Sequence, residues 1–177
     1  MKDLNEYRQA ILGWARDRNL IEGSTPEKQI DKLFEEVGEF AGAAARSGVP
    51  EKREAMLITM QDSIGDAFVV MCILAEQMGI ELDFSKMERY NDCVSNRVMY
   101  LTAGCLAGLS EALDRGVEDI DKIENAEHFY FAISSAEALA ESHGFVYLDC
   151  VDMAWNEIKD RKGRMIDGVF VKEADLV

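Results

Sequence analysis

The sequence contains few of the residues that interrupt helices or bind soft metals. Its 177 residues include only two prolines, two histidines and four cysteines. Scarce proline, together with abundant alanine, leucine, methionine and glutamate, favours helices. The cysteines form no C-x-x-C pair, so neither a zinc site nor a redox motif is indicated, and we expect buried free thiols.

Long apolar segments and an excess of positive charge are also missing. The longest apolar run, 67–75, is shorter than the roughly 20 residues that span a bilayer. The first ten residues, MKDLNEYRQA, contain no apolar signal-peptide core. These features predict a cytoplasmic protein without membrane association. The net charge of −15 argues against nucleic acid as a partner, because nucleic-acid binders present basic faces.

Helical periodicity covers most of the chain and predicts an all-α bundle forming a single domain, 1–177. Thr25 and Pro26 form a helix start, with a capping hydroxyl followed by an N1 proline. A short extended piece is expected at VFV in the glycine-punctuated tail. The helices are expected over 3–19, 26–48, 51–78, 84–98, 100–115, 119–143 and 148–162.

The two halves of the chain show a faint resemblance to each other. Residues 74–87 align with 139–153 after one insertion, and 33–41 can be laid on 105–113. This favours two degenerate helical-hairpin repeats that share one core. The first, 1–98, would keep an acidic metal site, and the second, 99–177, would have lost it and carry the basic C-terminal segment. The alternative is that any two amphipathic hairpins look alike.

The stretch KLFEEVGEFAGAAAR, 32–46, has the apolar rhythm of a packed helix but carries three acids, Glu35, Glu36 and Glu39. Glu36 and Glu39 are three residues apart and therefore share a helix face. On the next long helix, Asp62 and Asp66 are four residues apart and share a face as well. Because the connecting turn is short, the two helices should pack antiparallel and bring both pairs to the same height.

Four carboxylates across one groove would repel strongly without a cation, and oxygen-only ligation suits Mg²⁺ or Mn²⁺. The alternative is a solvated acidic face. A di-iron site normally adds Glu-x-x-His motifs, and the histidines, His128 and His143, lie in neither acidic pair. The pattern therefore predicts a metal site formed by Glu36, Glu39, Asp66 and, as a fourth ligand, Asp62.

The segments EEVGE, 35–39, and DSIGDAFVV, 62–70, resemble the all-α nucleoside triphosphate pyrophosphohydrolases. That superfamily includes the MazG-like enzymes, phosphoribosyl-ATP pyrophosphohydrolase and the dimeric dUTPases. Its pattern is E-E-x-x-E followed by E-x-x-D on the neighbouring helix. The tail, 155–173, also resembles the closing segment of some MazG-like proteins. One position departs from the pattern, because Ser63 stands where the family has glutamate and Asp62 comes one residue earlier.

The resemblance implies hydrolysis of a (d)NTP to the monophosphate and pyrophosphate with Mg²⁺. Glu35 would then orient or deprotonate the attacking water. The expected phosphate contacts are Lys32, Lys159, Arg161, Lys162 and Arg164, and the weaker expected base contacts are Trp14, Asn91 and Asn156. Lys32, the basic cluster and Trp14 have plainer alternatives, which are an ion pair, a basic helix end and a core position, respectively.

The resemblance further implies a homo-oligomer, either a dimer or a tetramer. Three alternatives to a general (d)NTP hydrolase stay open. The specificity could be that of a dUTPase or dCTPase. The protein could instead be a catalytically inactive nucleotide-binding member, as Ser63 would suggest. From its net charge alone, it could also be an acidic interaction protein.

Overall fold

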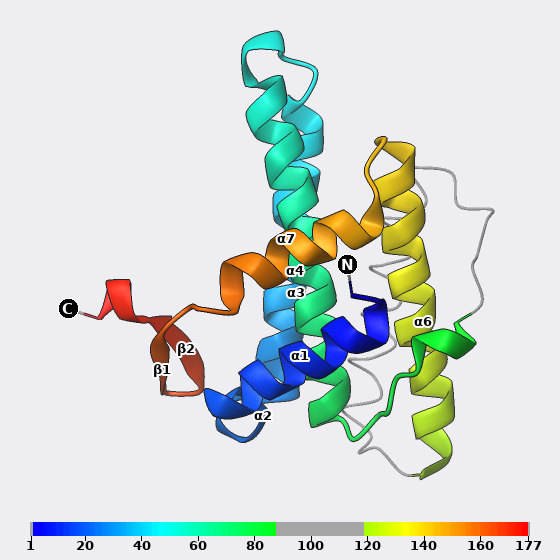
Figure 1. Cartoon of the computed structure of the whole chain (residues 1–177), viewed down its shortest axis with the longest axis vertical. Helices are drawn as coiled ribbons and strands as arrows, with labels where there is room; N and C mark the ends of the chain where they lie inside the picture. Colours follow the sequence, from blue (N-terminus) through cyan, green and yellow to red (C-terminus); the bar gives the residue numbers. More distant parts are fainter. Residues whose placement is uncertain (1, 88–118, 177) are drawn as a thin grey trace.

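The chain is all-α, as predicted. The computed structural model describes residues 2–87 and 119–176 (Figure 1). The α-helices are α1 (Leu4–Asp17), α2 (Leu20–Gly23), α3 (Pro26–Arg46), α4 (Arg53–Gln77), α6 (Asp119–Ser142) and α7 (Tyr147–Ile158). Short 3₁₀ turns lie at Pro50–Lys52, Phe84–Lys86 and Glu173–Asp175, and two strands, β1 (Gly163–Ile166) and β2 (Val169–Lys172), form one hairpin.

The helix ends follow from local chemistry. Asp3 and Glu6 form a reciprocal capping box at the start of α1. Thr25 accepts a hydrogen bond from the amide of Lys28, with Pro26 in the first turn of α3, as the sequence predicts. After α4 the chain turns through Gly79, which has a positive φ of 67° that glycine adopts without strain.

Helix α4 is the centre of the core and packs against α1, α3, α6 and α7. It runs antiparallel to α3, and the turn between them projects beyond the other helices (Figure 1). Helix α7 crosses α4 at Gly65, where a Cβ atom would lie 2.2 Å from the carbonyl oxygen of Cys150 and 2.8 Å from the Cβ of Ala154. Only glycine allows this close approach.

One segment of the described residues, Pro50–Gln77, is long and apolar enough to pass for a membrane span. In the folded chain, 67% of its most apolar window is buried inside the protein. Such burial is typical of the core helix of a soluble protein. Cys72 and Cys150 are buried free thiols, as expected, whereas Cys93 and Cys105 lie outside the described residues.

Several predicted boundaries are wrong. The first helix ends at Asp17, because Asn19 adopts a left-handed conformation and begins the separate short helix α2. The predicted helix 84–98 opens instead with a 3₁₀ turn followed by extended backbone at Met87. The predicted helix 148–162 ends at Ile158. The rest of 84–98 and the whole of 100–115 lie outside the described residues, so the proposed repeat and its division of the chain remain predictions.

The tail forms an antiparallel hairpin, of which the sequence predicted only the extended piece in β2. Its two-residue turn, Asp167-Gly168, has positive φ at both positions (49° and 78°), as the tightest hairpin turns require. Two contacts fix the tail to the helices. The ammonium group of Lys28 donates to the carbonyl of Asp167, and Arg18 Nε donates to the carbonyl of Arg161 at 2.8 Å. The hairpin therefore lies against the start of α3.

Candidate functional site

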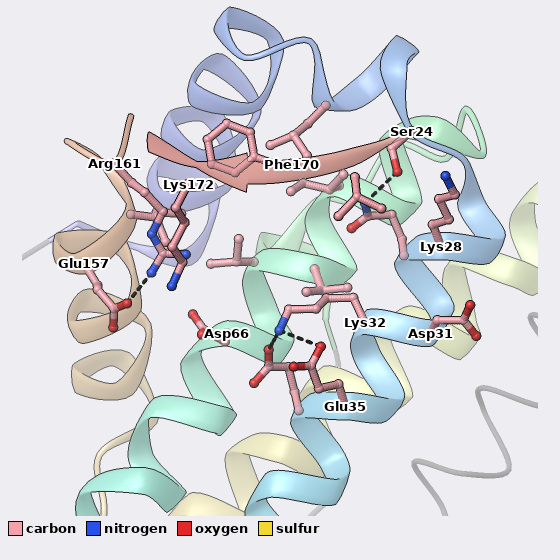
Figure 2. Close-up of a pocket in the computed structure, with 18 of the residues that line it drawn as sticks. Ser24, Lys28, Asp31, Lys32, Glu35, Asp66, Glu157, Arg161, Phe170 and Lys172 are labelled. Atoms are coloured by element: carbon pink, nitrogen blue, oxygen red, sulfur yellow. Dashed lines mark hydrogen bonds and ion pairs between the residues drawn. The ribbon is translucent and has the colours of Figure 1, made fainter. Parts of the chain in front are cut away.

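An open cavity of about 800 Å³ lies between α3, α4, the C-terminal end of α7 and the hairpin. Figure 2 shows β2 crossing above it, with Asp66 and Glu35 below. Its lining is strongly acidic and combines side chains from three helices. The acids are Asp31, Glu35, Glu36, Glu39, Asp62, Asp66 and Glu157.

The structure brings together all five acids that the sequence selected. Glu35, Glu36 and Glu39 come from α3, and Asp62 and Asp66 come from α4. The antiparallel packing of α3 and α4 brings the acids of the two helices to the same cavity. Glu36 is the most enclosed, at 2% exposed, whereas Glu35 and Glu39 face solvent.

Burial and mutual repulsion make the carboxyl groups of Glu36, Asp62 and Asp66 reluctant to ionise. Burial raises the pKa of Asp66 to about 7, with further contributions from Glu36, Asp62 and Glu157. Burial also raises the pKa of Asp62, and its hydrogen bond with Glu157 adds to the effect. Two carboxyl groups can share such a bond only when one of them holds a proton.

Lys32 supplies the cation nearest to the α3 acids. Its ammonium group lies 2.6 Å from Glu36 Oε1 and 3.0 Å from Glu35 Oε2 (Figure 2). Burial nevertheless raises the pKa of Glu36, although the bond to Lys32 opposes that shift. Lys32 thus lines the predicted phosphate site, but in this structure it is ion-paired with two of the acids.

Only part of the predicted basic cluster reaches the cavity. Arg161 lines it, pairs with Glu157 and offsets a small part of the burial that raises the pKa values of Asp62 and Asp66. Lys159, Lys162 and Arg164 are not among the lining residues, and Lys159 instead donates to Asn156 Oδ1 at 2.7 Å. The reason is that α7 ends at Ile158, so the following residues leave the helix and enter the hairpin.

Two lining residues important to the site, Glu157 and Phe170, were missed as candidates, and a third, Lys172, was noted only as a cation beyond the basic cluster. Glu157 lies one helical turn before Arg161, a spacing that could have indicated an ion pair beside the cavity. Lys172 and Phe170 reach the cavity on β2. Alternation along a strand places these two on the same side, but the sequence alone does not say that the hairpin folds over α3 and α4.

Of the predicted base contacts, too, only some line the cavity. Trp14 lines the cavity. Asn156 does not, because its side-chain amide donates to Asp152 Oδ2 at 2.9 Å on the exposed side of α7. Asn91 lies outside the described residues.

Ser63 does not line the acidic cavity, whereas Asp62 does. The Ser63 hydroxyl is buried and donates to the carbonyl of Thr59 at 2.9 Å. It lies beside a small, almost wholly apolar void of about 40 Å³ between α3, α4 and α6. The rotation of α4 thus presents Asp62 and Asp66, four residues apart, to the acids of α3.

The donor set fits a hard divalent cation, because carboxylate oxygens from α3 and α4 converge. Burial, with repulsion between the acids, raises the pKa values of Glu36, Asp62 and Asp66, and a bound cation would relieve both effects. As placed, no three acidic, histidine or cysteine side chains in the described residues form a ready-made metal site. A cation bound here would be held by Glu36, Glu39, Asp62 and Asp66, and Lys32 would have to give up its bond to Glu36.

Comparison with known proteins shows a similarity to a phage protein. The chain is 46% identical over 87 residues to an uncharacterized 18.2 kDa protein in the rep-hol intergenic region of Haemophilus phage HP1. The match covers 49% of this chain and 48% of the phage protein, so the matched region spans about half the length of this curated relative. No family model matches the chain, and no solved structure matches it.

Proposed function

We propose that this protein is a cytoplasmic, Mg²⁺-dependent nucleoside triphosphate pyrophosphohydrolase. The observation that carries the proposal is the meeting of acids from α3, α4 and α7 in one cavity that Arg161 and Lys172 also line. The motif resemblance of EEVGE and DSIGD supports the same reaction. Carboxylates and cations in one cavity suit a triphosphate, which needs metal ions for charge neutralisation and basic groups for its outer oxygens.

The bound Mg²⁺ would neutralise charge on the phosphates and on the transition state. The other roles fall to the protein. Arg161 and Lys172 bind phosphate oxygens. Glu35, which faces solvent one position before Glu36, holds a water molecule and takes its proton. The water oxygen forms a bond to phosphorus as the anhydride P–O bond between the α- and β-phosphates breaks, giving the nucleoside monophosphate and pyrophosphate.

The test is pyrophosphate release from each common ribo- and deoxyribonucleoside triphosphate, with and without Mg²⁺. We expect Mg²⁺-dependent release that is abolished in Glu36→Gln. The chain offers a matched pair for the phosphate contacts: Arg161→Met should raise KM strongly, whereas Arg164→Met, altered outside the cavity, should not. Release that is unaffected by Glu36→Gln would contradict the proposal. A preference for dUTP or dCTP would favour the narrower specificity.

The second candidate is a nucleotide-binding protein that does not hydrolyse its ligand. The ion pairs of Lys32 with Glu35 and Glu36 favour it, because they occupy the acids that would hold a metal ion and water. Nucleotide-dependent thermal stabilisation without release of pyrophosphate from any triphosphate would support this candidate. A melting temperature that responds to neither nucleotide nor Mg²⁺ would instead favour an acidic interaction protein.

A further inference from the structure

The lining of the cavity changes character along the α3–α4 pair. On α4, the acids at Asp62 and Asp66 are followed one and two turns later by Val70 and Ile73. On the antiparallel α3, the region beside this apolar part is the first turns of the helix, which include Gln29. The apolar part is lined by Trp14, Leu20, Val69, Val70, Ile73 and Phe170. Neither a metal ion nor phosphates can use such a surface.

Two aromatic rings form a corner in this apolar part. The rings of Trp14 and Phe170 meet edge to face, with centroids 5.9 Å apart and an interplanar angle of 62°. The guanidinium of Arg18 lies 4.9 Å from the centre of the Trp14 ring. Phe170 lies above the cavity on β2 (Figure 2), where its ring is available for a flat ligand to stack upon.

Polar groups in the same region call for a ligand with hydrogen-bonding atoms. Trp14 is 8% exposed, and its buried indole N–H has no hydrogen-bond partner among the described residues. Gln29 is 7% exposed and also lines the cavity, and its amide makes only a long bond, 3.4 Å, to Ser24 Oγ. A buried donor without a partner destabilises the protein unless a ligand or water satisfies it.

We propose that this apolar part binds the base of the nucleotide, an inference that rests on the proposed function. The base stacks on Phe170, the indole N–H of Trp14 donates to an acceptor on its edge, and the Gln29 amide pairs with a neighbouring edge atom. A nucleobase combines the required features: a flat apolar face and a rim of donors and acceptors. The phosphates then extend toward Arg161, Lys172 and the acids.

Uncharged nucleosides test this site without metal ions or hydrolysis. The chain has two tryptophans, so Trp155→Phe leaves Trp14 as the sole indole fluorophore. We expect saturable quenching of Trp14 fluorescence by at least one nucleoside and none by ribose. Gln29→Leu should weaken that binding by about tenfold, the effect of losing a hydrogen bond to a buried group. Gln9→Leu, an exposed glutamine on α1, is the matched control.

Phe170→Leu provides a second variant if Gln29→Leu lowers the melting temperature, and it should weaken binding as well. The proposal is overturned if no nucleoside quenches more than ribose, or if both variants bind as tightly as the parent. Pyrophosphate release at equal rates from every nucleotide and from inorganic tripolyphosphate, without nucleoside binding, would leave the hydrolase and remove the base site. Nucleoside binding without hydrolysis would support the base site and contradict the hydrolase.

Discussion

The ammonium group of Lys32 lies 2.6 Å from a carboxylate oxygen of Glu36, the most buried acid of the cavity. The lysine itself is about half exposed, so it can leave more cheaply than the glutamate can. This pairing makes Lys32 a competitor of any metal ion that binds Glu36.

Replacing Lys32 with methionine should therefore separate protein stability from cation binding. Without metal the melting temperature should fall, because Glu36 loses the partner of its buried charge. With Mg²⁺ the rise in melting temperature should exceed that of the parent protein, since no ammonium competes. Thermal denaturation with EDTA or Mg²⁺ measures both. Lys86→Met, which breaks an exposed pair with Asp83, is the control, and an unchanged or smaller Mg²⁺ effect would refute the competition.

The raised pKa of Asp66 predicts that the metal-free protein becomes more stable on acidification. The folded carboxyl holds its proton up to a pKa of about 7, against 3.8 for the free group. Between these values the folded state binds more protons than the unfolded state. The free energy of unfolding should thus fall as pH rises through this window, by up to about 1.4 kcal/mol per pH unit.

Asp66→Asn should flatten this pH dependence and raise the melting temperature at neutral pH in EDTA, because it removes the repulsion. The exposed Asp17→Asn serves as the control. Saturating Mg²⁺ should weaken or reverse the slope in the parent, since the cation favours the ionised carboxylate. Melting curves between about pH 5 and 8 decide, and equal slopes in parent and Asp66→Asn would contradict the assignment.

Ser63→Glu should not create a better metal site. Ser63 is 2% exposed and lies beside the apolar void against α6, which Glu36 also lines, so a new carboxylate there would be buried next to a second acid and without a cation of its own. We expect a loss of about 3 kcal/mol or more in the free energy of unfolding. Ser63→Ala, which loses only the bond to the Thr59 carbonyl, should stay within about 1 kcal/mol. Chemical denaturation measures both, and raised activity in Ser63→Glu would show that the position faces the acids.

Replacing glycine with alanine should have opposite effects on stability at two positions, because Gly65 lies at the crossing of α4 and α7 and Gly38 does not. Gly65→Ala places a Cβ 2.2 Å from the Cys150 carbonyl oxygen and should cost about 1–3 kcal/mol. At Gly38, on the exposed side of α3, an added Cβ meets nothing within 4 Å. Gly38→Ala should stabilise by about 0.5–1 kcal/mol, because alanine is the better helix former. Denaturant midpoints compare the two variants, and a stabilised Gly65→Ala would mean that the helices can separate at little cost.

Local chemistry made much of the fold predictable. The capping hydroxyl of Thr25, the proline after it and the periodic apolar residues set the start of α3, because each acts within a few residues. The short connection at Pro50 set the antiparallel pairing of α3 and α4. From that pairing followed the meeting of Glu36 with Asp66, which needed no knowledge of distant contacts.

The sequence by itself determined the all-α class, the start of α3 and the acids of α3 and α4 that line one cavity, since these depend on periodicity and short connections. The tertiary structure decided the rest. Helix rotation placed Asp62 inside and Ser63 outside, because Gly65 must face α7. The end of α7 and the folding of the hairpin selected Arg161 and Lys172 from a longer run of basic residues and brought Phe170 to Trp14. Contacts between residues about 150 positions apart, such as Trp14 and Phe170, cannot be predicted from local sequence patterns.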